Sequence, residues 1–400
     1  MPADRSYAPD QLWMPDVIAD PYPAYAQLRD ESPLQYVLLP KGAVAGLDAP
    51  VMAWAFMRHD DAIAALRDHD TFASGRDPLA GKAFPKMVLL QDDPPRHSRF
   101  RQLVNKAFTM RRIETLTPWI EDTAAKLLDQ AGEGEVDVMS KYAVPLPVTV
   151  IARLLGIPAT DLDAFKRWSD SLLAISSAPP EERARQNQEM AQYFGRMVAQ
   201  RRTQGAEDLI TTLVESEIDG ERLQDAEILG FCILLLVAGN ETTTNLIGNL
   251  LGILADRPEL WERLRADRGL VEPVINETLR YESPVHRLPR QVTRDVEIRG
   301  TRIPAGARVS IFYGAANRDP AAFPEPDVFR PERDTRGNLA FGQGIHYCLG
   351  APLARAEAAI TLNALLDRFP TLSRGEAPAA RQRASLVVYG YQRLPLALRR

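Results

Sequence analysis

The sequence predicts a mainly α-helical protein with small β-sheets, folded as a single domain over residues 1–400. Apolar residues recur at spacings of three to four over most of the chain, which is the period of an amphipathic helix. The β-type segments are short and lie scattered between these helical stretches. No internal repeat and no low-complexity linker divides the chain. We expect the first 20 residues to form an irregular N-terminal arm.

Seven stretches carry the helical pattern most clearly. Two of them also have recognisable starts, because an acidic residue closely follows Asp225 and because Pro258 stands where a first-turn proline is tolerated. The predicted helices cover residues 60–67, 118–130, 159–173, 181–204, 225–255, 258–265 and 271–281.

Short strands and irregular segments make up the rest of the predicted fold. The predicted strands cover residues 51–57, 292–298, 309–312 and 385–389, and a turn at residues 304–306 separates the middle two. Residues 318–344 are rich in Pro, Asp, Gly and Arg and have no clear periodicity. Because so long an irregular stretch inside a compact domain is normally functional, we expect it to have a functional role.

The composition argues against several classes of protein. Hydrophobic residues make up 45% and charged residues 25% of the chain, as in an ordinary soluble globular protein. The net charge is −5 with both signs interspersed, which argues against nucleic acid or an anionic membrane as a partner. The longest apolar run, residues 228–239, is about half of what spans a bilayer, so we expect a buried helix. No signal peptide is visible, and Cys232 and Cys348 cannot make a disulfide framework, so we expect a cytoplasmic protein.

The ten residues F-G-Q-G-I-H-Y-C-L-G, 341–350, are the most informative in the chain. Glycines at positions 342, 344 and 350 allow close backbone approach and positive φ angles. An alanine-rich helix with Pro352 in its first turn follows directly. Cys348 therefore lies at a helix N-terminus, where free N–H groups and the helix dipole stabilise a metal-binding thiolate.

Cys348 fits three alternative roles less well. A lone cysteine is usually a small buried apolar residue, and Cys232 matches that description because it lies in the middle of an apolar helix. A dinucleotide-binding fingerprint fails because Tyr347 occupies the third glycine position and no strand precedes it. A zinc site needs more cysteine or histidine ligands than this neighbourhood contains.

This stretch resembles the haem-binding loop of the cytochrome P450 family, F-x-x-G-x-[HR]-x-C-x-G, which is matched by Phe341, Gly344, His346, Cys348 and Gly350. Three further motifs occur in the family's order, and the resemblance covers the chain from about residue 20 to its end. It implies a single-domain P450 fold, a triangular prism of helices around a buried haem. It also implies that the Cys348 thiolate is the axial ligand of the iron of haem b.

The segment E-T-L-R, residues 277–280, is an E-x-x-R motif. At a spacing of i, i+3 the side chains of Glu277 and Arg280 share one helix face. Taken alone, the motif would be an exposed ion pair worth a few tenths of a kcal/mol. The resemblance implies instead a buried pair, joined by Arg333, that locks the region behind the haem.

The segment A-G-N-E-T-T, residues 238–243, interrupts the most apolar helix with a glycine and polar side chains. Such an interruption often marks a π-bulge or a distorted turn at a functional site. The alternative is a polar stripe that reaches solvent, or threonine hydroxyls that donate to the carbonyl oxygen at i−4. It resembles the family's [AG]-G-x-[DE]-T-T. The resemblance implies that Glu241 and Thr242 are the catalytic acid–alcohol pair that delivers protons during oxygen cleavage.

Four cationic side chains match haem contacts in the family. His97 and Arg101 fit an H-x-x-x-R helix start, and Arg290 and His346 match two further positions. The resemblance implies that all four contact the haem propionates, and cationic donors suit carboxylates through charge-assisted hydrogen bonds. Further cofactor contacts are expected from Ala238, Phe341, Gly342 and Gly350.

The implied activity is insertion of one oxygen atom from O₂ into a mostly apolar small organic substrate, by hydroxylation or epoxidation. Because no flavin or iron–sulfur cysteine pattern is present, we expect electrons from a ferredoxin and its reductase. We also expect the protein to be a monomer. The ferredoxin is expected to dock on the cysteine side, at Arg99, Lys106, Arg111 and Arg112.

Two other functions remain open from the sequence. One is a haem-thiolate peroxygenase that uses peroxide, although such relatives tend to lack the acid–alcohol pair. The other is a non-catalytic haem sensor or recruitment protein, which the intact Cys348 and Thr242 argue against.

The substrate pocket is predicted from positions along the family pattern. Nearly all of its side chains are apolar, which favours a largely hydrocarbon substrate. His286 and the neighbouring Arg287 are exceptions that could bind a substrate oxygen, unless Arg287 points to solvent. The predicted lining is Phe84, Met87, Val88, Leu89, Leu90, Leu172, Leu173, Ile175, Leu234, Ala238, Thr242, Val285, His286, Leu288, Val387 and Val388.

Overall fold

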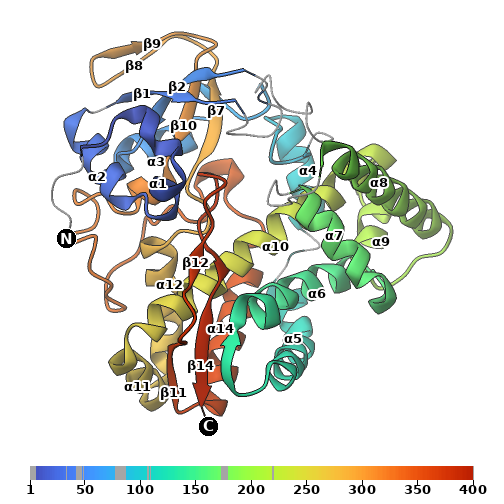
Figure 1. The fold of residues 1–400 in the computed structure, drawn as a ribbon. Coiled ribbons are helices and arrows are strands. Elements are labelled where there is room, and N and C mark those ends of the chain that lie inside the picture. The colour runs from blue at the N-terminus through green and yellow to red at the C-terminus, as the bar shows by residue number, and fades with distance from the viewer. Residues whose placement is uncertain are drawn as a thin grey trace.

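Helices dominate the fold, as the sequence predicts, and the strands form small separate sheets (Figure 1). The computed structural model describes residues 6–32, 34–41, 47, 49–76, 87–105, 108, 110–172, 179–218 and 220–399.

The helices are α1 (Pro15–Ala19), α2 (Tyr22–Glu31), α3 (His59–Arg67), α4 (Arg96–Asn105), α5 (Met110–Ala131), α6 (Pro145–Leu154), α7 (Leu162–Leu172), α8 (Pro180–Thr203), α9 (Leu209–Glu215), α10 (Asp225–Ala255), α11 (Pro258–Ala266), α12 (Val271–Tyr281), α13 (Tyr313–Ala316) and α14 (Ala351–Arg368). Short 3-10 turns are η1 (Pro9–Trp13), η3 (Ala159–Asp161), η4 (Arg268–Leu270) and η5 (Gly344–His346), and η2 (Met139–Ala143) is a π-helix.

The strands are β1 (Gln35–Leu39), β2 (Val51–Phe56), β3 (Phe72–Ala73), β4 (Gly134–Asp137), β5 (Glu217–Ile218), β6 (Glu221–Arg222), β7 (Leu288–Val292), β8 (Val296–Ile298), β9 (Thr301–Ile303), β10 (Arg308–Ile311), β11 (Thr371–Arg374), β12 (Ala380–Arg381), β13 (Tyr391–Arg393) and β14 (Pro395–Arg399). The largest sheet has the order β1-β2-β10-β7-β3, in which β10 pairs with β2 in parallel and the other pairs are antiparallel. This sheet lies beside the N-terminal helices (Figure 1).

Helix α10 runs through the middle of the molecule and contacts α6, α8, α12 and α14 (Figure 1). Its start is capped because the backbone N–H of Gln224 donates to the Glu227 carboxylate at 3.0 Å. By length and composition the helix could cross a membrane, but 56% of its most apolar window is buried inside the protein, as in a core helix. Its apolar side chains join the largest core cluster, which α5, α6, α12 and α14 complete.

Several predicted boundaries are confirmed and others are wrong. The predicted helices over residues 225–255 and 271–281 match α10 and α12 residue for residue. Helix α5 begins earlier than predicted and contains Pro118. The buried side chains of Ile113 and Ile120 lie on either side of the proline, which removes only one backbone hydrogen bond of the helix. The arm predicted to be irregular contains η1 and α1, whose apolar side chains Leu12, Val17 and Ile18 are buried.

The predicted strand over residues 385–389 is wrong. These residues form a loop between β12 and β13, and only Val388 makes a β-bridge, to Val285. The predicted strand over residues 292–298 is divided between β7 and β8. The predicted turn before the next strand is confirmed, because Ala307 N–H donates to Pro304 O at 3.1 Å and Gly306 has a φ of +83°.

Candidate active site

The loop that carries Cys348 is held by its own backbone. Gly342 and Gly344 have φ angles of +71° and +68°, which other residues rarely adopt. A Cβ atom on Gly344 would also collide with the carbonyl oxygen of Leu66. The backbone N–H of Cys348 donates to Phe341 O at 2.9 Å, which closes the loop directly before α14. Gly342 and Gly344 therefore have the positive φ angles that the sequence predicts, whereas Gly350 has a φ of −83°.

Cys348 lines a cavity of about 440 Å³, and the residue as a whole is half-buried. Burial raises the pKa of this thiol, while hydrogen bonds from the backbone N–H groups of Gly350 and Ala351 and the charge of Arg101 act in the opposite direction. A coordinated metal ion would favour the thiolate over the thiol, in addition to these donors. Cys232, in contrast, is fully buried in the core, as predicted.

Four cationic or imidazole side chains gather at one end of the cavity. Arg101, Arg290 and His346 line it, and the ring of His97 lies 4.5 Å from that of His346. Both ring nitrogens of His97 and the Nε2 atom of His346 are buried and have no hydrogen-bond partner among the described residues. Burial and the charge of Arg290 lower the pKa of His346 to about 2, and burial and Arg101 lower the pKa of His97. Unpartnered nitrogens in a positive potential fit a ligand with carboxylates, as haem propionates would be.

Helix α10 contributes the polar segment 238–243 to the same cavity. Ala238, Glu241 and Thr242 line it, and the Thr242 hydroxyl donates to Ala238 O at 2.7 Å. The helix is α-helical throughout, so the π-bulge is absent and the i−4 hydrogen bond is the feature observed. Gly239 is needed for packing, because a Cβ atom there would lie 2.6 Å from Cδ1 of Ile151 on α6.

The remaining predicted cofactor contacts, Phe341, Gly342 and Gly350, also line the cavity. So do nine of the residues predicted to contact substrate. These are Leu89, Leu90, Leu234, Ala238, Thr242, Val285, Leu288, Val387 and Val388. Phe84, Leu173 and Ile175 lie outside the described residues, and the side chain of Leu172 is not described.

Two predicted pocket residues, Met87 and Val88, do not line the cavity. Val88 is 3% exposed and belongs to the core, and Met87 packs against that core. The reason is a tight turn over residues 87–91, in which Leu89 has a φ of +71° and Leu90 N–H donates to Val88 O at 2.9 Å. The turn directs Leu89 and Leu90 into the cavity and Val88 away from it.

His286 and Arg287 are also absent from the cavity wall, which corrects the predicted polar contacts to substrate. His286 is 1% exposed, lies 3.1 Å from the hydroxyl of Tyr25, and stacks on Tyr389. Burial and the charge of Arg318 lower its pKa to about 3, so the imidazole is neutral.

Arg287 is fully buried rather than exposed to solvent. Its Nη1 atom donates to the Ser310 hydroxyl at 3.0 Å and its guanidinium lies 4.8 Å from the centroid of the Trp13 ring. Residues 286 and 287 therefore attach the strand β7 region to the N-terminal helices, while their neighbours Val285 and Leu288 face the cavity.

Several cavity-lining polar residues escaped prediction, among them Gln382, Ser385 and Glu357. Ser385 begins the segment that was predicted to be a strand and is a loop, and Gln382 precedes that segment, so no pattern assigned either side chain to the cavity. Glu357 is a lone acid on the buried face of α14, and burial raises the pKa of its carboxyl to about 8. An acid on an apolar helix face is the signal that could have identified Glu357.

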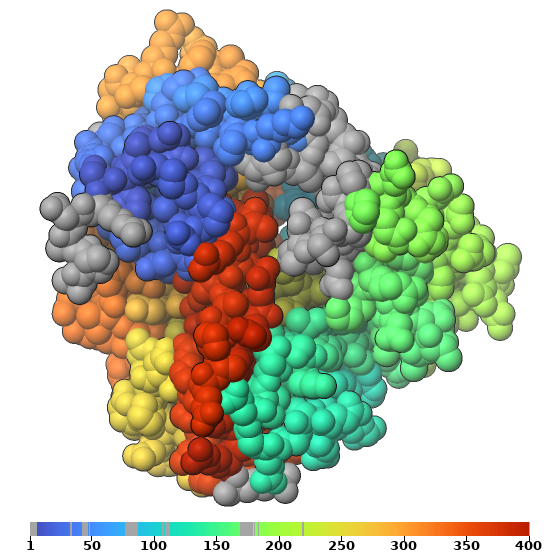
Figure 2. Space-filling model, in the orientation of Figure 1, coloured from blue at the N-terminus to red at the C-terminus, as the bar shows by residue number. Residues whose placement is uncertain are grey.

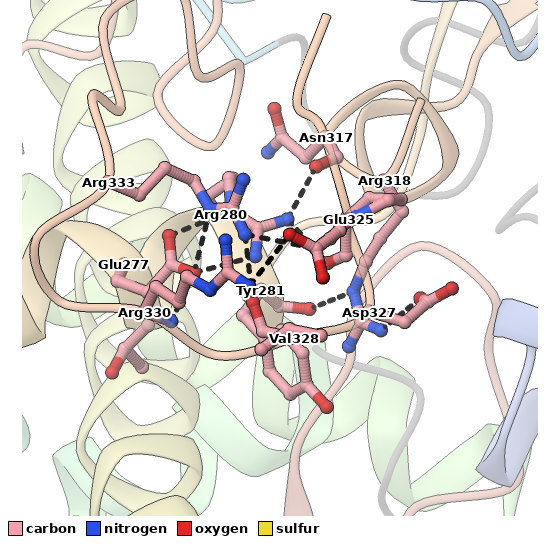
Figure 3. Close-up of polar contacts among 12 residues, drawn as sticks. Glu277, Arg280, Tyr281, Asn317, Arg318, Glu325, Asp327, Val328, Arg330 and Arg333 are labelled. Carbon is pink, nitrogen blue, oxygen red and sulfur yellow. Dashed lines mark hydrogen bonds and ion pairs between the residues drawn. The ribbon is translucent and has the colours of Figure 1, made fainter. Parts of the chain in front are cut away.

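The E-x-x-R pair is buried, as expected from the resemblance. Arg280 donates to both carboxylate oxygens of Glu277, at 2.7 and 2.8 Å, and both side chains are fully buried. Arg333 Nε donates to the same carboxylate at 3.2 Å (Figure 3). Arg280 also donates to the carbonyl oxygens of Asn317 and Pro326, at 3.0 and 2.9 Å. The cluster thus fastens α12 to the irregular segment that precedes the cysteine loop.

Removing the Glu277 carboxylate should destabilise the protein strongly. Glu277→Leu leaves two arginines buried with no compensating charge, and we expect a loss of about 3–5 kcal/mol in the free energy of unfolding. Urea unfolding measures it. Glu272→Gln is the matched control, because Glu272 is exposed on the same helix, and it should change stability by less than about 0.5 kcal/mol. Equal effects of the two substitutions would contradict the role of the cluster.

The predicted basic patch is only partly described. Arg99 is 43% exposed and makes an ion pair with Glu221. Arg111 and Arg112 lie in the first turn of α5, where their side chains are not described, and Lys106 lies outside the described residues.

Comparisons with known proteins match this geometry to one family. A family model described as Cytochrome P450 matches residues 165–389. The chain is 41% identical over 375 residues to Cytochrome P450 monooxygenase PikC of Streptomyces venezuelae, covering 91% of this chain and 87% of that protein. It is 37% identical to Vitamin D(3) 25-hydroxylase of Pseudonocardia autotrophica, covering 95% and 94%. The solved structure of CYP109E1 from Bacillus megaterium in complex with corticosterone aligns with a TM-score of 0.85 and 35% identity, covering 96% and 99%.

Proposed function

The chain belongs to the cytochrome P450 family, whose cofactor is haem b held by a cysteine thiolate, and from this we propose that it oxygenates a mostly apolar small organic substrate with electrons from a ferredoxin. The activity of its relatives is that of monooxygenases and hydroxylases. The observation that carries the proposal is one cavity that joins the Cys348 loop, the cationic end and the polar turn of α10.

Residues from three parts of the chain, which are α4, β7 and the cysteine loop, would hold the haem. The Cys348 thiolate would bind the haem iron, and the hydrogen bonds from Gly350 and Ala351 would temper its charge. The two propionates would be bound by His97, Arg101, Arg290 and His346, and their carboxylates would accept hydrogen bonds from the unpartnered nitrogens. When bound, the haem supplies the activation of O₂ and the transfer of one oxygen atom to the substrate.

Glu241 and Thr242 move protons at the cavity wall. Monooxygenation releases one oxygen atom as water, so it consumes two protons for each substrate molecule. The carboxyl of Glu241 exchanges protons with solvent, and the Thr242 hydroxyl, which donates to Ala238 O here, turns to donate into the cavity. Supporting this role, both side chains line the cavity from the same turn of α10.

The substrate is a largely hydrocarbon molecule. Leu89, Leu90, Leu234, Val285 and Leu288 present an apolar wall, and burying apolar surface stabilises binding by about 25 cal/mol per Å². Two relatives agree with this class of ligand, because one is a vitamin D(3) 25-hydroxylase and the other, CYP109E1, was solved in complex with corticosterone. The ferredoxin docks on the cysteine side, near Arg99 and the start of α5.

A ligand panel tests the substrate class. Steroids, terpenoids, macrolides and small charged organic acids are titrated into the ferric holoprotein, and the spin state is followed by absorption. We expect low-micromolar dissociation constants and the largest shift from an apolar compound, because ligand binding displaces water from an apolar wall. A full shift with small charged acids and none with apolar compounds would contradict the proposal.

A further inference from the structure

The loop over residues 382–390 forms part of the substrate wall although it contains no regular strand. It belongs to the C-terminal segment, drawn red, which crosses the face of the molecule next to the blue N-terminal segment (Figure 2). Ala384, Ser385, Val387 and Val388 line the cavity. Their positions are therefore decided by how the loop is held, rather than by a sheet.

Gln382 holds the loop from within. Its Nε2 atom donates to Ser385 O at 2.7 Å and to Val388 O at 2.5 Å. Its Oε1 atom accepts from the backbone N–H groups of Ala384 and Ser385, both at 3.1 Å. One amide side chain, 7% exposed, thus binds four backbone groups of the loop.

The loop is also held from behind. His286 N–H donates to Val387 O at 2.8 Å, and Tyr389 N–H donates to Pro284 O at 2.9 Å. The His286 side chain lies in the buried cluster with Tyr25 and Tyr389. The Gln382 amide binds the backbone N–H and C=O of Ser385, and these further bonds hold the rest of the loop. The Ser385 side chain therefore has a defined place in the cavity wall.

The Ser385 hydroxyl is a hydrogen-bond donor without an acceptor among the described residues. Its Oγ atom accepts from the backbone N–H of Val387 at 3.1 Å, and no described group accepts its proton. Ser385 is half-buried and lies among apolar cavity residues such as Val387 and Val388. The Gln382 amide faces the same cavity but is already bound to the loop.

The other polar side chains of the cavity come from other walls. Arg101, Arg290 and His346 form the cationic end, and Glu241 and Thr242 belong to the proton-delivering turn. Thr243 is also on α10, and Gln343 and Glu357 belong to the cysteine loop and α14.

We propose that Ser385 is a specificity-determining residue, whose hydroxyl donates a hydrogen bond to a ketone or hydroxyl oxygen of the substrate. The inference rests on the proposed function and names the substrate class more closely: an apolar molecule with an oxygen atom that faces the 382–390 loop. Gln382 is the positioning residue, because it fixes the backbone of Ser385. Ser385 makes the polar contact that the sequence suggested for His286 or Arg287.

The test is a cycle of protein variants and matched ligands, read by the spin-state shift of the ferric holoprotein. The probes are testosterone, androst-4-en-3-one, which lacks the 17-hydroxyl, and androst-4-en-17β-ol, which lacks the 3-ketone. Ser385→Ala should weaken testosterone and the one analogue that keeps the bound oxygen by about 3–10-fold, as expected for a neutral hydrogen bond. Binding of the other analogue should not change, and Ser385→Thr should restore the wild-type pattern.

Ser385→Ala also removes the acceptor of the Val387 N–H, so a moved loop must be distinguished from a lost hydrogen bond. Gln382→Leu supplies the comparison, because it loosens the loop and should weaken all three steroids alike. The proposal is overturned if Ser385→Ala weakens all three equally or none of them. It is also overturned if no steroid binds the wild type while other apolar compounds do, which leaves the proposed function standing. If no apolar compound shifts the spin state, the proposed function itself fails.

Discussion

Cys348→Ser should abolish monooxygenase turnover and the red-shifted absorption band of the reduced, carbonyl-bound protein, while the far-ultraviolet circular dichroism stays helical. Serine keeps the size of the side chain and the helix N-terminus, but its oxygen is not the soft, electron-rich ligand that favours O–O cleavage. The loop should survive, because it is closed by the Cys348 N–H bond to Phe341 O, which the substitution retains.

Cys232→Ala is the matched control for that experiment. Cys232 is fully buried in the core cluster and does not line the cavity. The control should retain the spectrum and turnover, with a small loss of stability from the missing sulfur atom. A Cys348→Ser protein that kept the red-shifted band would contradict the ligand assignment.

The proton-delivering pair should give the second large effect. Thr242→Ala should bind haem and substrate normally but divert most reducing equivalents to hydrogen peroxide, because O₂ is then reduced without productive cleavage. Glu241→Gln should slow turnover by about 10²–10⁴-fold if proton transfer becomes limiting. The measurements are product and peroxide formed per NADH consumed.

Thr244→Ala serves as the control for Thr242→Ala. Thr244 lies two residues further along α10, but it is buried and its hydroxyl donates to Ala143 O at 3.0 Å, outside the cavity. Its substitution should leave the ratio of product to NADH unchanged. A wild-type ratio in both Thr242→Ala and Glu241→Gln would refute the proton-delivering role.

Local signals predict the long helices and the cofactor residues. Helix α10 is predicted residue for residue because its apolar pattern and the acids at its start are properties of neighbouring residues. The cysteine loop is identified for the same reason, since its glycines and the following helix are contiguous. The burial of Glu277 requires the family resemblance, because an E-x-x-R spacing alone does not distinguish an exposed from a buried pair.

The errors lie where partners distant in sequence decide the structure. Residues 385–389 are apolar enough for a strand, but the Gln382 amide binds their backbone groups and leaves one bridge to Val285. His286 is predicted to line the pocket because it lies between Val285 and Leu288, and its burial depends on Tyr25, which is 261 residues away. Val88 is displaced from the pocket by a tight turn with Leu89 at positive φ, a conformation that a leucine does not signal.

The origin of the oxygen atom in the product is the most direct test of monooxygenase activity. Holoprotein, ferredoxin, ferredoxin reductase and NADH are incubated under ¹⁸O₂ with the panel compound that gives the largest spin-state shift, and the product is analysed by mass spectrometry. We predict an NADH-dependent product that carries one ¹⁸O atom. The proposed activity would be contradicted if no product formed with NADH, or if product formed only on addition of hydrogen peroxide.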